Sequence, residues 1–89
     1  MRAIVTVIGK DAVGILAKVS TKCAEYNANV IEVTQSVLQD MFAMTMLIDI
    51  SKLNKDFASL ADTLGELGDS MGLKIHTMHE DIFNCKHHI

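Results

Sequence analysis

The apolar residues of this chain change their spacing several times, and each spacing predicts one element of secondary structure. A β-branched run over residues 3–8 ends at Gly9, which predicts a short strand that stops at a turn. From Asp11 onward the apolar positions recur three or four residues apart, which predicts a helix that ends near Asn27. The stripe expected to face the core is Ala12, Leu16, Val19, Cys23 and Tyr26.

Two alternating segments follow this helix. Asn29 leads into a strand over residues 30–38, and strict alternation places one mostly apolar set on a single face. That set is Ile31, Val33, Gln35 and Val37. Gln39 and Asp40 have turn chemistry, and the next strand alternates again, so the two strands should form an antiparallel hairpin. The buried set of the second strand is Phe42, Met44, Met46, Ile48 and Ile50.

The last third of the chain predicts a second helix and a final strand. Asn54 is the expected N-cap of the helix and Gly72 its C-cap. The apolar stripe between these caps is Phe57, Leu60, Ala61, Leu64, Leu67 and Met71. A β pattern resumes over residues 73–79, with Lys74 and His76 on the face opposite Leu73 and Ile75.

The predicted order is therefore βαββαβ. Right-handed crossovers put both helices on one face of a four-stranded antiparallel sheet, so we expect an α+β fold of the ferredoxin-like type. The 89 residues are too few for two cores, and we expect one domain with a core over about 1–80 and a short tail over 81–89. A domain of this size buries only about two-thirds of its unfolded surface, which favours a homodimer.

Composition narrows the possible partners and locations. Eight Lys and Arg against eleven Asp and Glu give a net charge of −3, which disfavours nucleic acid and anionic membranes. One Tyr, three Phe and no Trp also argue against an RNA-binding sheet that stacks bases. Cys23 and Cys85 lack the spacing of a disulfide framework, and no stretch approaches the roughly 20 apolar residues of a membrane span. We expect a cytoplasmic protein.

Catalytic and metal-binding patterns are weak in this sequence. No Ser-His-Asp or Cys-His set can be assembled, so we expect neither an enzyme nor a cofactor. His76 and His79 are three apart on a predicted strand and should point to opposite faces. Cys85, His87 and His88 have zinc-ligand chemistry, but a terminal segment is no preformed scaffold, so we expect no physiological metal site there.

The first loop has more distinctive chemistry. It reads Gly9-Lys10-Asp11-Ala12-Val13-Gly14-Ile15-Leu16. This segment resembles the ACT domain family, small βαββαβ ligand sensors whose first loop reads Asp-x-x-Gly-hydrophobic-hydrophobic. Asn29-Val30-Ile31 resembles the Asn-Ile that opens the second strand in that family. The resemblance spans residues 1 to about 80 and is strongest to free-standing ACT proteins, akin to the ACT halves of the glycine-cleavage transcriptional repressor.

The resemblance implies a non-catalytic regulatory module that dimerises and binds a small ligand, an amino acid, at the first loop and the subunit boundary. Physical chemistry points the same way, because a helix N-terminus favours a carboxylate and Gly14 permits close approach. Asp11 could accept from an α-ammonium group, and Asn29 can both donate and accept. The candidate ligand residues are Lys10, Asp11, Ala12, Val13, Gly14, Ile15, Asn29, Val30 and Ile31.

Each of these residues also has a purely structural interpretation. Asp11 could be only a helix N-cap, Gly14 could serve helix packing, Asn29 could shape a turn, and Lys10 could be a solvated side chain. Two hypotheses therefore stand. The first is a dimeric amino-acid sensor that acts on a regulated protein partner, and the second is a ligand-free interaction or dimerisation module.

Overall fold

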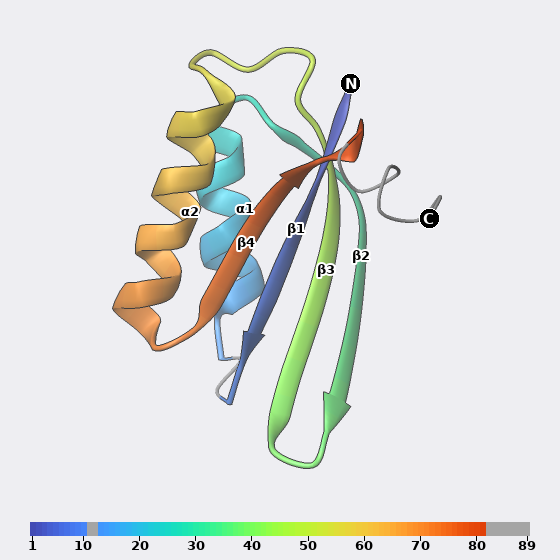
Figure 1. Cartoon of the computed structure of the whole chain (residues 1–89), viewed down its shortest axis with the longest axis vertical. Helices are drawn as coiled ribbons and strands as arrows, with labels where there is room; N and C mark the ends of the chain where they lie inside the picture. Colours follow the sequence, from blue (N-terminus) through green and yellow to red (C-terminus); the bar gives the residue numbers. More distant parts are fainter. Residues whose placement is uncertain (11–12, 82–89) are drawn as a thin grey trace.

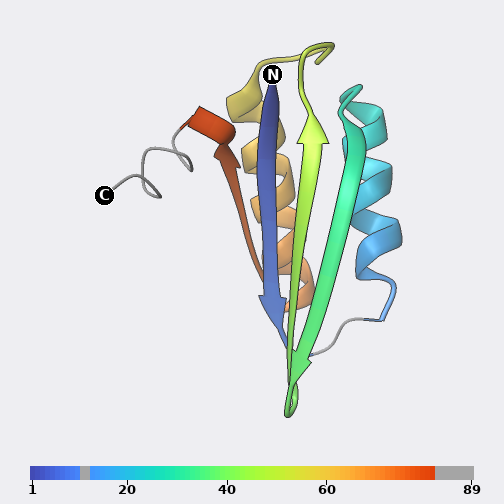
Figure 2. The same cartoon turned by 90° about the vertical axis from the view of Figure 1, so that its right-hand side faces the viewer.

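The fold is a two-layer α+β sandwich, described here from a computed structural model that covers residues 1–10 and 13–81. The elements are β1 (Arg2–Gly9), α1 (Ile15–Glu25), β2 (Asn29–Leu38), β3 (Met41–Asp49), α2 (Phe57–Met71) and β4 (Lys74–His79). The strands form one antiparallel sheet in the order β2-β3-β1-β4, and both helices cover the same face of it (Figures 1 and 2). The predicted ferredoxin-like βαββαβ fold is confirmed.

The core lies between the sheet and the two helices. The predicted alternation of β3 is confirmed, because every second residue from Phe42 to Ile48 is buried, as is Ile50 directly after the strand. Burial of these side chains, at roughly 25 cal/mol per Å² of apolar surface, is the main force that holds the helices to the sheet. The fully buried large side chains are Ile15, Met44, Met46, Ile48, Leu60, Leu64, Val5, Val7, Val19 and Cys23.

The β2–β3 hairpin turns at Gln39 and Asp40, as predicted, with Leu38 paired to Met41. The register then shifts between Val30 and Glu32. Val30 pairs with buried Ile48, and Val30 and Val33 both pack against the core. Ile31 lies at the shift and is 49% exposed, so the prediction that Ile31 shares a face with Val33 is wrong. A β-bulge adds one residue to a strand and reverses the alternation beyond it.

The first helix begins later than its spacing predicts. Gly14 is the N-cap and Ile15 the first helical residue, and it is Ile15, not Leu16, that is buried beside Val19 and Cys23. Leu16 is 38% exposed, so its place in the predicted core stripe is wrong, while Ala12 lies outside the described residues. The predicted end is confirmed, because Asn27 adopts a left-handed φ of 59°.

The caps of α2 differ from prediction at one end only. Gly72 closes the helix with a φ of 71°, as predicted. The N-cap is Asp56, whose Oδ1 accepts a hydrogen bond of 3.3 Å from the Ser59 N–H, so the assignment of Asn54 as cap is wrong. Asn54 instead donates from Nδ2 to the Glu25 carbonyl at 2.8 Å. It therefore ties the loop before α2 to the C-terminal end of α1.

Candidate ligand site

The first half of the predicted site is the loop between β1 and α1. Gly14 has a φ of 73° and its carbonyl accepts from the Lys18 N–H at 3.1 Å, while no side chain of the described residues caps the helix. The N–H groups of the first turn therefore have no partner within the helix. A helix N-terminus also carries partial positive charge, so this end of α1 can bind an anion. Val13 is exposed beside it.

The structural alternatives for this loop can now be compared with the geometry. A Cβ added at Gly14 would have no atom within 4 Å, so close packing does not explain the glycine, whereas its left-handed conformation does. The N-cap is Gly14. Asp11 and Ala12 lie outside the described residues, so the interpretation of Asp11 as a cap stays a prediction. Lys10 lies 3.9 Å from the Asp40 carboxylate, an exposed ion pair that contributes little stability.

The second half of the predicted site lies elsewhere in the same chain. Asn29 pairs with Asp49, which pairs in turn with Arg2 at the start of β1. The first loop follows Gly9 at the other end of that strand, about 23 Å away at the usual rise of a strand. The expectation that Asn29 lies at the same end as the loop is wrong for a single chain. The cause is α1, which carries the chain back along the sheet before β2 begins (Figure 1).

The Asn29 end has a pocket of its own. It has a volume of about 290 Å³ and is lined by Ala24, Asn27, Ala28 and Asn29. Val30 is half-buried against the core, and Ile31 lies at the bulge just beyond. The sequence analysis identified Asn27 only as a helix terminator. Asn27 lines the same pocket as Asn29 because the two residues are only two positions apart, and Asn27 itself adopts the left-handed conformation that ends the helix.

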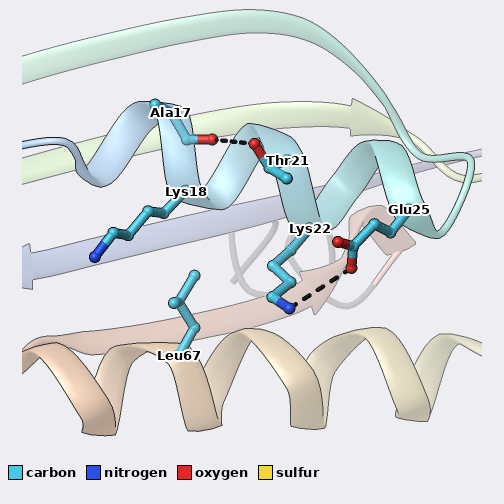
Figure 3. A pocket seen from close by; sticks show the side chains of 6 residues that line it. All are labelled: Ala17, Lys18, Thr21, Lys22, Glu25 and Leu67. Atoms are coloured by element: carbon cyan, nitrogen blue, oxygen red, sulfur yellow. Dashed lines mark hydrogen bonds and ion pairs between the residues drawn. The ribbon is translucent and has the colours of Figure 1, made fainter.

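A second groove, of about 350 Å³, lies between the helices (Figure 3). Most of its polar side chains already have a partner, because Lys22 lies 3.6 Å from Glu25 and the Thr21 hydroxyl donates to the Ala17 carbonyl at 2.8 Å, while Lys18 also lines the groove. Leu67 approaches from α2. The groove therefore offers a ligand fewer free polar groups than the two ends of α1.

The outer edge of the sheet beside α1 is long and unprotected. β2 pairs with β3 on one side only, carries no proline, and has Glu32 as its one charged residue. Val37 and Leu38 at its end are 69% and 75% exposed. Natural edge strands usually carry charges, prolines or bulges that prevent pairing with another chain. Apart from Glu32 and the bulge at Ile31, β2 lacks such protection.

One flank of α1 continues this edge. Residues four apart on a helix lie on one side, and Leu16, Ser20 and Ala24 form such a row. This row lies on the side of α1 away from the groove that faces Leu67, so it faces the β2 edge. Leu16 and Ala24 are exposed. The row and the strand edge together form a continuous open side of the domain, which we call the β2 side.

Perturbed ionisable groups lie away from this side. The ion pair of Arg2 with Glu80 lowers the pKa of Glu80, and the Ser51 hydroxyl and N–H lower the pKa of Asp49. Burial raises the pKa of the Cys23 thiol to about 11, so Cys23 stays neutral and unreactive. These shifts support the fold rather than a reaction centre.

The histidines are separated as predicted. His76 pairs with Thr6 and His79 with buried Ala3, on opposite faces of the sheet. In the part of the chain that the structure describes, no three His, Cys, Asp or Glu side chains are grouped to hold a metal. The tail cluster of Cys85, His87 and His88 lies outside that part. Among the same residues, no helix has the length and apolar character needed to cross a bilayer.

The βαββαβ fold, the left-handed glycine before the first helix and the asparagine that opens β2 define a class of small regulatory domains. The sequence model of that class, described as an ACT domain, matches residues 2–78. The chain is also 46% identical over 87 residues to a UPF0237 protein of Listeria monocytogenes, with 98% of each chain covered. This protein therefore belongs to the ACT domain family, as one of its UPF0237 members.

Solved structures agree with this assignment. An ACT domain protein from Streptococcus pneumoniae superposes with a TM-score of 0.81 at 36% identity, with 93% of each chain covered. A putative glycine cleavage system transcriptional repressor superposes with a TM-score of 0.71 at 24% identity, over 89% of this chain and 47% of that one. The second likeness concerns the fold alone. Both comparisons agree with the resemblance seen in the first loop.

Proposed function

We propose that this protein is a non-catalytic sensor in which two copies pair along β2 and bind one small zwitterion, an amino acid, at each end of the seam. The observation that carries the proposal is the separation of the two predicted half-sites. Lys10 to Ile15 and Asn29 to Ile31 lie at opposite ends of one sheet, with the open β2 side between them.

A two-fold axis through the middle of β2 would unite the half-sites. Antiparallel pairing of two β2 strands places the start of one strand beside the end of the other. Asn29 of one copy then lies at the level of Leu38 of the other copy. In that other copy Gly9 pairs with Phe42, and Phe42 pairs with Val37, so Gly9 and the loop after it lie at the same level as Leu38. The pairing would also cover the exposed Val37, Leu38 and Leu16.

The chemistry of the two ends of α1 suits a zwitterion. The N-terminus of α1 in one copy, which no side chain of the described residues caps, favours an α-carboxylate. The C-terminal end of α1 in the other copy carries partial negative charge and the Asn29 amide, both of which favour an α-ammonium group. Asp11 would add a carboxylate acceptor beside the first loop. A ligand held by both copies would order the seam, and this ordering would change how the dimer contacts a regulated protein.

The oligomeric state of the protein in solution tests the proposed pairing of two β2 strands. We expect a dimer in sedimentation analysis, and we expect Val37→Asp to produce monomers because it places a charge on the β2 edge. Ile8→Asp is the matched control, since Ile8 is exposed on β1, an inner strand of the sheet. A wild-type monomer, or equal effects of the two variants, would overturn the pairing.

The shared site is tested by mixing variants. Calorimetry against the twenty amino acids should detect one or more ligands, and Asp11→Ala and Asn29→Ala should each abolish binding. Each heterodimer of these two variants would keep one intact site and one doubly altered site. Random exchange of subunits should therefore restore about a quarter of the sites. No recovery would place the site within one chain, and a dimer that binds none of the twenty would favour the ligand-free module.

A further inference from the structure

Two asparagines line the pocket at the C-terminal end of α1. They are Asn27 and Asn29, and the other two lining residues are Ala24 and Ala28. Neither amide side chain hydrogen-bonds to any other part of the described chain, although the Asn27 backbone N–H donates to the Ala24 carbonyl at 3.1 Å. Both residues are exposed, so these donors and acceptors are open to a ligand.

The backbone conformation at Asn27 permits an amide side chain without requiring one. Glycine adopts the left-handed conformation at a helix end most easily, and asparagine is the usual substitute. The other helix of this chain ends that way, in Gly72 with a φ of 71°. α1 ends with a φ of 59° at Asn27, so the same conformation is reached by a residue that adds an amide to a pocket.

We propose that Asn27 is a specificity-determining residue that selects an amino acid with a short, uncharged, polar side chain, such as serine, threonine or asparagine. This inference rests on the proposed function, in which Asn29 contacts the α-substituents of the ligand. Asn27 lies two residues earlier in the same pocket and meets the side chain. Its amide both donates and accepts, so a hydroxyl or an amide of the ligand satisfies it.

Other ligand classes fit this pocket less well. An apolar side chain would remove water from the Asn27 amide without replacing its hydrogen bonds, which weakens binding. An acidic side chain would lie beside the partial negative charge of the α1 C-terminus. The pocket has a volume of about 290 Å³ and its other lining residues, Ala24 and Ala28, have small side chains, so it accommodates a compact ligand side chain.

Matched ligand pairs test the inference by calorimetry. Threonine and valine have nearly the same shape, as do asparagine and leucine, so each pair isolates the polar group. The wild-type dimer should bind the polar member about tenfold more tightly, the effect of one net hydrogen bond. Asn27→Gly keeps the left-handed conformation and removes the amide, so it should reduce this preference to near parity and leave the affinity for valine within about twofold.

Thr21→Ala, on the opposite flank of α1, is the control and should leave the preference unchanged. Circular dichroism verifies that each variant is folded. If Asn27→Gly keeps the tenfold preference, the role of Asn27 is overturned and the proposed sensor stands. If the wild type prefers valine or leucine, the inference is also wrong. If the wild type binds none of the twenty amino acids, the proposed function itself fails.

Discussion

The two βαβ halves of this domain share one architecture, yet they differ in how completely their polar groups are satisfied. α2 is capped at its start by Asp56 and at its end by Gly72, and its Gly68 packs directly against β4. α1 starts at Gly14 with no cap from any side chain in the described ranges. Both halves leave one outer strand edge unpaired, at β2 in the first half and at β4 in the second. We call the second half closed because its helix is capped at both ends, and the first half open because no side chain of the described residues caps the start of its helix.

This difference separates groups that stabilise the fold from groups that can bind. A hydrogen-bond donor that already has a partner contributes to folding and offers a ligand little, whereas an open helix N-terminus or strand edge retains that capacity. The open start of α1 and the unpaired edge of β2 both belong to the first half. Substitutions in the closed half should therefore change stability, and substitutions on the β2 side should change association or binding instead.

The largest contrast is expected between two leucines on the helices. Leu64 of α2 has no exposed surface, and Leu64→Ala should lower the free energy of unfolding by about 3 kcal/mol, because a cavity is left in the core. Leu16 of α1 is 38% exposed, and Leu16→Ala should lower it by less than about 1 kcal/mol. Urea unfolding at low protein concentration measures both. Equal losses would show that the first half is as closed as the second.

Two glycines of α2 provide the next comparison. A Cβ at Gly68 would lie 2.9 Å from the Ile75 side chain and 2.9 Å from the Leu73 carbonyl oxygen, so Gly68→Ala should lower the free energy of unfolding by about 1 to 2 kcal/mol. A Cβ at Gly65 meets nothing within 4 Å, so Gly65→Ala should raise it by about 1 kcal/mol through helix propensity. Thermal unfolding separates the pair, and changes of the same sign would contradict the packing of α2 on β4.

The closed half is also the half that the sequence predicts best. In β3 and α2 the apolar positions keep one period from end to end, because one face of each element is buried along its whole length. Phe42 to Ile50 and Leu60 to Leu64 are therefore placed correctly. The wrong cap at Asn54 has a local cause, since Asp56 and Asn54 are both good caps and only the loop geometry chooses between them.

The open half is predicted less well for physical reasons. The bulge at Ile31 changes the face of each following residue, and alternation alone contains no sign of it. The left-handed Gly14 delays α1 to Ile15 and turns Leu16 outward. The placement of Asn29 could have been derived, because a helix that follows a strand returns the chain to the start of that strand. The sequence predicts which residues belong to the two half-sites. Their positions at opposite ends of the sheet follow only from the order and direction of the strands.

The two left-handed residues that flank α1 should respond in opposite ways to substitution. Gly14→Ala adds a Cβ in a left-handed conformation and should lower the free energy of unfolding by about 1 kcal/mol. Asn27→Gly relieves the same conformation and should raise it by a few tenths of a kcal/mol. Urea unfolding measures both, and a loss in Asn27→Gly would mean that its amide supports the fold rather than remaining open to a ligand.

The smallest expected effect is a change in acid stability at the start of α2. The hydroxyl and N–H of Ser59 lower the pKa of Asp56 from its ordinary value of 3.8. A carboxyl whose pKa is lower in the folded state stabilises the protein fully above its unfolded pKa, and this stabilisation is lost as the pH falls through the folded pKa. Asp56→Asn keeps a capping side chain that does not titrate, so the free energy of unfolding should fall less steeply between about pH 5 and pH 2.

Asp49 and Glu80 also have lowered pKa values, so part of the acid destabilisation will remain in this variant. The informative quantity is therefore the difference between the wild-type and Asp56→Asn curves, measured by urea unfolding at each pH. If the two curves run parallel, the hydrogen bond between Asp56 and Ser59 does not cap α2 in solution. The N-terminus of α2 would then lack a side-chain cap, as the described N-terminus of α1 does.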